Sequence, residues 1–139
     1  MRKLKRQIKY WLPPILWACV IFMSSSRSVP GASEIHWQDF VVKKTAHVVV
    51  YAILSLLMYR GFLNNGYGKK KAGYLAILIS VLYGATDEFH QSFTSGRQPT
   101  LRDVFFDTIG AVFIIYSIWN WLHKMPKKLK LWAKRLDLD

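Results

Sequence analysis

Residues 73–91 read GYLAILISVLYGATDEFHQ, an apolar run that ends in the two adjacent carboxylates Asp87 and Glu88. The chain has four such apolar blocks, at roughly 10–26, 45–63, 72–93 and 104–122, and its charges lie between them. A bilayer core of about 30 Å requires about 20 residues of helix. The pattern predicts an all-α fold: a four-helix membrane bundle over residues 1–125, followed by a basic amphipathic tail over residues 126–139.

Composition agrees with a single membrane domain. The chain has 139 residues, of which 52% are hydrophobic, and yet it carries a formal net charge of +12. Its one cysteine, Cys19, lies inside the first apolar block, which excludes an intrachain disulfide framework. The basic start MRKLKRQIK could also introduce a signal peptide, but Pro13 and Pro14 open the apolar run and no A-x-A site follows. We therefore expect this block to remain as a membrane helix.

The basic residues predict the orientation of the bundle. With four spans, the side that holds both termini carries fifteen Lys and Arg residues, and the other side carries five. The positive-inside rule then places both termini on the cytoplasmic side of the plasma membrane. Six of the eight acidic residues fall on the opposite, outward side. The unusual polar residues are thus expected to meet at the outward face.

The two terminal segments are both basic and amphipathic. In the tail, Leu129, Trp132, Ala133 and Leu136 share one helical face, which is typical of a helix lying on the inner leaflet. A frayed basic tail remains the alternative. Because the positive charge is concentrated beside the membrane, membrane lipids are the expected partners, and nucleic acid is not expected.

A polar constellation is predicted at three outward helix ends. In the second helix, Lys43, His47 and Tyr51 lie four residues apart and form one face, and Asp87 and Gln91 repeat this spacing at the end of the third helix. At the start of the fourth helix, Thr100 and Asp103 have the spacing of a helix N-terminus, whereas Asp107 lies one turn deeper and has no capping role. Gly110, further along the same helix, is expected to allow a close helix approach. The candidate ligand-binding residues are Lys43, Lys44, Tyr51, Gln91, Arg97, Asp103 and Asp107, and the candidate catalytic residues are His47, Asp87 and Glu88.

The placement of the charges indicates that these ends face one another. Asp87 and Glu88 lie in the last turns of their helix, and Lys43 and Lys44 lie in the first turns of theirs. The helix macrodipole disfavours both placements. The two carboxylates and the two lysines would therefore be more stable facing each other than alone at their own helix ends. We expect the ends to converge, with His47 within reach of Asp87 and Glu88. The groups form either an ion-pair lock or a ligand pocket, and the surplus of acids favours the pocket.

Three motifs carry a family resemblance. They are K-x-x-H-x-x-x-Y from Lys44, D-E-x-x-Q-x-F-x-x-G-R from Asp87 and D-x-x-x-D-x-x-G from Asp103. Together they resemble the VanZ-like family over residues 20–115. The resemblance implies a small multi-pass bacterial membrane protein associated with glycopeptide, and specifically teicoplanin, resistance. It also implies an Asn where this chain has Asp107, so a neutral amide role at that position does not carry over.

Three functions compete on these residues. The leading hypothesis is an envelope protein whose outward pocket binds an anionic lipid-linked cell-wall intermediate, with lysines and Arg97 engaging phosphate. The second is an enzyme on the same lipid class, with His47 as general acid or base. The third is a small ion-coupled carrier, which the apolar inner halves of the helices disfavour. No cofactor or metal is predicted, although Asp87, Glu88 and Asp107 are the oxygen ligands that Mg²⁺ would require.

Overall fold

The computed structural model describes residues 2–25, 36–93 and 101–138, and all its regular elements are helical. No strand occurs in these ranges, which confirms the predicted all-α class. Each apolar block lies largely within one long helix, and the block at 45–63 lies wholly within its helix. In chain order the elements are α1 (Arg2–Ser25), α2 (His36–Asn64), α3 (Lys69–Gln91), α4 (Leu101–Trp121), the 3₁₀ turn η1 (Leu122–Lys124) and α5 (Lys127–Arg135).

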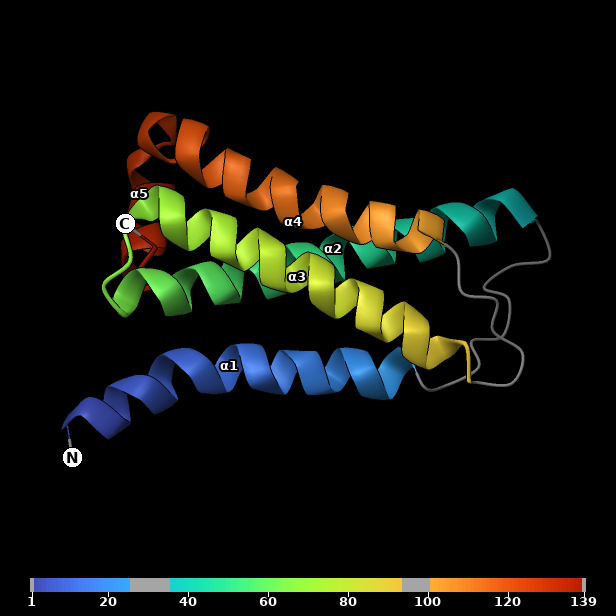
Figure 1. The fold of residues 1–139 in the computed structure, drawn as a ribbon. Coiled ribbons are helices and arrows are strands. Elements are labelled where there is room, and N and C mark those ends of the chain that lie inside the picture. The colour runs from blue at the N-terminus through green and yellow to red at the C-terminus, as the bar shows by residue number, and fades with distance from the viewer. Residues whose placement is uncertain (1, 26–35, 94–100, 139) are drawn as a thin grey trace.

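The long helices lie side by side and alternate in direction (Figure 1). Helices α2, α3 and α4 pack on one another, and α1 packs mainly on α2 with a lighter contact on α3. Both chain termini lie at the same end of the molecule (Figure 1). Gly66 turns the chain between α2 and α3 with a φ of 94°, a left-handed conformation that glycine adopts without steric cost.

Glycine allows the closest approach between helices. A Cβ added at Gly110 of α4 would lie 2.1 Å from the backbone oxygen of Val48 in α2. The sequence predicted a close helix approach at Gly110, and this geometry confirms it. At Gly73 of α3, a Cβ would lie 2.2 Å from the indole of Trp119. Small residues therefore set the spacing on which the polar side chains between the helices depend.

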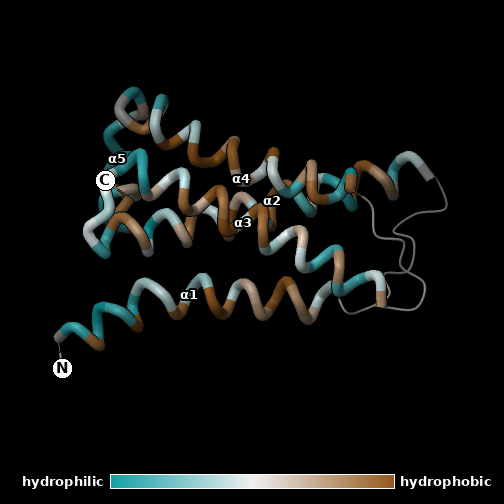
Figure 2. Tube along the Cα trace, in the orientation of Figure 1, coloured by the Kyte–Doolittle hydropathy of each residue, from teal (hydrophilic) through white to brown (hydrophobic). Residues whose placement is uncertain are grey.

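Large apolar side chains remain exposed on all four long helices. Examples are Leu16 on α1, Val42 on α2, Leu82 on α3 and Phe113 on α4, each with about half of its surface exposed. Brown, hydrophobic segments run along the middle of each helix in Figure 2, and hydrophilic segments gather towards the ends. Within the described ranges, segments 3–25 and 40–64 are long and apolar enough to cross a membrane. The four-span arrangement stays a prediction.

The two basic terminal segments are both helical. The N-terminal arm belongs to α1, which continues through Pro13 and Pro14. In the tail, α5 has the predicted amphipathic pattern, but it is partly packed against the bundle. Ala133 is buried, and so is Leu138 just beyond the helix, whereas Trp132 is exposed. The frayed-tail alternative is therefore not what the structure shows.

Candidate functional site

The predicted site residues gather where α1 and α3 end and where α2 and α4 begin. We call this the polar end, and the opposite end, which holds both termini, the basic end. Four helices contribute to the polar end, so its side chains come together only when the helices pack. Its described members are Ser25, Lys43, Lys44, His47, Tyr51, Asp87, Glu88, Gln91, Asp103 and Asp107.

His47 and Asp107 form the deepest polar pair. The imidazole Nδ1 of His47 lies 2.8 Å from Oδ1 of Asp107, and the Asp107 side chain is only 1% exposed. The His47 side chain is 21% exposed. No side chain in the described ranges bonds the second ring nitrogen, Nε2. Asp107 therefore fixes the ring and leaves Nε2 available to another molecule.

Lys44 and Asp103 form a second pair of α2 with α4, about one turn nearer the helix starts. Both side chains are largely buried. The Lys44 ammonium also lies 5.5 Å from the ring centroid of Phe40 and 5.7 Å from that of Phe106, within cation–π range. An ammonium held by a carboxylate and two rings has a fixed position, so it can present its charge to a ligand without a large ordering cost.

Asp87 joins α1 to α3. The Ser25 hydroxyl donates a 2.6 Å hydrogen bond to Oδ1 of Asp87, and the Gln91 amide donates a 3.0 Å bond to Oδ2. All three side chains are buried. Sequence reasoning missed Ser25, because a serine at the end of an apolar helix carries no signal of its partner. Each oxygen of the carboxylate thus accepts from one neutral donor.

Tyr51 lies between these pairs. Its side chain is buried, and its hydroxyl has no hydrogen-bond partner in the described part of the protein. The charges of Asp87, Glu88 and Asp107 all act on this phenol, so the three carboxylates share one region. A Cβ added at Gly84 would lie 3.3 Å from the Tyr51 ring and 3.0 Å from Oδ2 of Asp107. The absence of a side chain at Gly84 therefore leaves space for the Tyr51 ring and the Asp107 carboxylate.

The pairing differs from the predicted one. Lys44 was expected opposite Asp87 and Glu88, and His47 within their reach, but Lys44 pairs with Asp103 and His47 with Asp107. The cause is that α2 packs most extensively on α4. Residues 44 and 47 then face residues 103 and 107. The two residues of each pair are about one helical turn apart, so both contacts can form together.

The remaining predictions at this end have different outcomes. Glu88 is buried and Lys43 is half-buried. Arg97, and Thr100 with its expected helix-start role, lie outside the described residues. Across the described ranges, no group of three His, Cys, Asp or Glu side chains is arranged to hold a metal ion. The structure therefore offers no support for Mg²⁺ at Asp87, Glu88 and Asp107.

Comparison with known proteins gives one result. The model of the VanZ/LLP1 family matches residues 10–123, a range that includes the whole polar end. No curated protein and no solved structure matches the chain. The match extends over most of the chain, and the resemblance noted from the three motifs is confirmed. The chain belongs to the VanZ/LLP1 family.

Proposed function

We propose that this protein is an envelope membrane protein with four spans, whose polar end faces outward. Exposed apolar side chains on all four long helices support the spans, because a soluble protein rarely exposes such a surface. The fifteen-to-five division of basic residues supports cytoplasmic termini. The common position of both termini at one end is what an even number of spans requires (Figure 1).

The proposed role of the polar end is to bind an anionic lipid-linked cell-wall intermediate, and so to alter susceptibility to glycopeptides such as teicoplanin. The observation that carries this proposal is the set of buried polar side chains that four helices bring together there. Lys44, held by Asp103, supplies a positioned charge for phosphate, and Lys43 and Arg97 would add to it. His47 and the buried acids would accept or donate hydrogen bonds to sugar or peptide groups.

Lipid mass spectrometry of gently purified protein tests this binding. Wild-type protein should retain a phosphate-bearing polyprenyl lipid, and Lys44→Gln should lose most of it because a charge-assisted contact to phosphate is removed. Lys71→Gln, an exposed position at the basic end, is the matched control and should retain the lipid. Equal retention by wild type and Lys44→Gln would remove Lys44 from the binding role. Absence of any such lipid from wild type would end the proposal.

A second candidate function is acid–base catalysis on the same lipid class, and the His47–Asp107 pair favours it. An imidazole that a carboxylate orients through Nδ1 can move a proton at Nε2. Turnover of a lipid-linked phosphate substrate by wild type, lost in His47→Gln while lipid retention persists, would establish this function. Retention without turnover in wild type leaves binding alone.

A further inference from the structure

A cavity of about 480 Å³ lies at the basic end, far along the helices from the site just described. Helices α2, α3, α4 and α5 line it together with η1, and its walls combine lysine stems with apolar side chains. The volume is within the usual range for pockets that hold small molecules. Its lining residues are Tyr59, Lys69, Lys70, Ile118, Trp119, Leu122, Lys130, Ala133 and Leu138.

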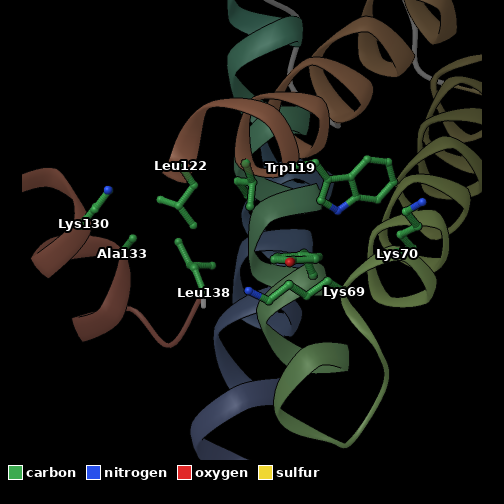
Figure 3. Close-up of a pocket in the computed structure, with 9 residues that line it drawn as sticks. Lys69, Lys70, Trp119, Leu122, Lys130, Ala133 and Leu138 are labelled. Carbon is green, nitrogen blue, oxygen red and sulfur yellow. The ribbon is translucent and has the colours of Figure 1, made fainter. Parts of the chain in front are cut away.

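The cavity has an apolar wall and a cationic rim. Leu122, Leu138 and Ala133 form one side, and Trp119 faces them across the gap (Figure 3). Lys70 and Lys130 lie at opposite edges (Figure 3). Neither of these two lysines forms an ion pair with a residue in the described ranges. Such a lining suits a molecule that has both an anionic group and an apolar part.

Two helix starts add positive potential at the same place. Lys69 and Lys70 begin α3, and Lys130 lies in the first turns of α5. Neither helix has a side-chain cap or an acidic residue in its first turn. The free N–H groups and the macrodipole of a helix start attract anions, and lysines at such a start are otherwise unfavourable. An anion in the cavity would offset both penalties.

The described acid at this end does not compete for the rim lysines. Asp137 is already bonded to Lys9 and Arg60.

We propose that this cavity binds the phosphate-bearing headgroup of an anionic phospholipid from the leaflet at the basic end. Lys70 and Lys130 present their ammonium groups to the anionic headgroup from opposite edges of the cavity, and the Trp119 ring adds to the apolar wall. The leucines and Ala133 contact the glycerol and the beginning of an acyl chain. Free phosphate would not use this apolar wall, and a zwitterionic lipid would bring its own cation to the lysine rim. The proposal rests on membrane insertion but not on the role of the polar end.

Lipid exchange in nanodiscs tests the proposal. Nanodiscs would contain phosphatidylcholine with a minor fraction of phosphatidylglycerol, and native mass spectrometry of released protein would count the retained lipids. We expect wild type to retain one phosphatidylglycerol, and Lys70→Gln/Lys130→Gln to lower its retention about tenfold or more, since each ammonium makes a charge-assisted contact. Lys127→Gln/Lys128→Gln changes the net charge equally at exposed positions outside the lining and should stay within about twofold of wild type.

Each other outcome contradicts the proposal. Equal losses in the two double variants would show a diffuse charge effect in place of a site. Equal retention of phosphatidylcholine would show that the anionic group is not recognised. Displacement of the lipid by millimolar inorganic phosphate would identify a free-phosphate site.

Discussion

The acidic side chains at the polar end and at the basic end differ in how far they are exposed to solvent. At the polar end, Asp107 and Asp87 are 1% and 5% exposed, and each bonds to a side chain on another helix or on its own. At the basic end, Asp137 is 31% exposed and bonds to Lys9, whose side chain is 56% exposed. One end buries its acids, and the other leaves them in contact with water.

This difference predicts where substitutions will be costly. Removing one partner from a buried polar pair leaves the other without compensation, and the full desolvation penalty then counts against folding. Each residue of an exposed ion pair can interact with water when its partner is removed, so such a pair contributes little to the free energy of unfolding. The polar end therefore costs more to maintain than the exposed ion pairs at the basic end.

The largest expected effect is that of Asp107→Ala. This change leaves Nδ1 of His47 without its partner between α2 and α4 and opens a space beside Tyr51 and Gly84. We expect the free energy of unfolding in detergent to fall by about 3–5 kcal/mol. Asp137→Ala, at the basic end, is the matched control and should have a much smaller effect. Similar losses for the two variants would remove the distinction between the ends.

A smaller effect is expected from Gly110→Ala. The new methyl group would meet the backbone of Val48, which cannot move aside as a flexible side chain could. Separation of α2 from α4 should cost about 1–3 kcal/mol and loosen the Lys44 and His47 pairs together. Gly68→Ala is the control, because nothing lies within 4 Å of a Cβ at that position. Unchanged thermal unfolding of Gly110→Ala would show that the helices are not as close as described.

Hydrophobic patterning was sufficient to predict where the helices lie in the sequence. It was not sufficient to predict which face of each helix turns towards which neighbour. The block at 45–63 lies inside α2, and the block at 104–122 covers nearly all of α4. Periodicity also placed residues 43, 47 and 51 on one face. It could not tell which neighbour that face meets, so Lys44 and His47 were assigned to Asp87 and Glu88 in place of Asp103 and Asp107. That choice depends on which helix pair packs most closely.

The missed residues share a physical reason. Ser25, which donates to Asp87, and Trp119, which lines the basic-end cavity, belong to apolar helices and are uncharged, so the sequence does not show which side chains they meet. Their roles arise only from what another helix places opposite them. Gly110 was the exception. The sequence alone predicted a helix contact there, because small residues in membrane helices typically lie where two helix backbones approach closely.

Asp87→Asn separates folding from function at the polar end. An amide keeps the shape of the carboxyl group, its oxygen can accept from Ser25, and Gln91 can turn its own amide to accept from the new NH₂. We expect the free energy of unfolding to change by less than about 1 kcal/mol, while teicoplanin susceptibility changes to that of a deletion strain. Asp87→Leu, which removes both acceptors, should instead lower protein abundance. Wild-type susceptibility at wild-type abundance in Asp87→Asn would contradict a functional role for this charge.

The smallest expected effect concerns the pH response of the basic end. A hydrogen bond from Lys9, assisted by Arg60, lowers the pKa of Asp137 below its ordinary value of 3.8. A lowered folded-state pKa means that the stabilisation is complete above the ordinary pKa and is lost as the pH falls through the lowered one. Asp137→Asn should therefore reduce the melting temperature slightly at pH 7 and leave it unchanged at a pH below both values. Added salt should shrink the difference at pH 7, because exposed charges are screened. A pH-7 effect as large as that of Asp107→Ala would show that the basic end is held as tightly as the polar end.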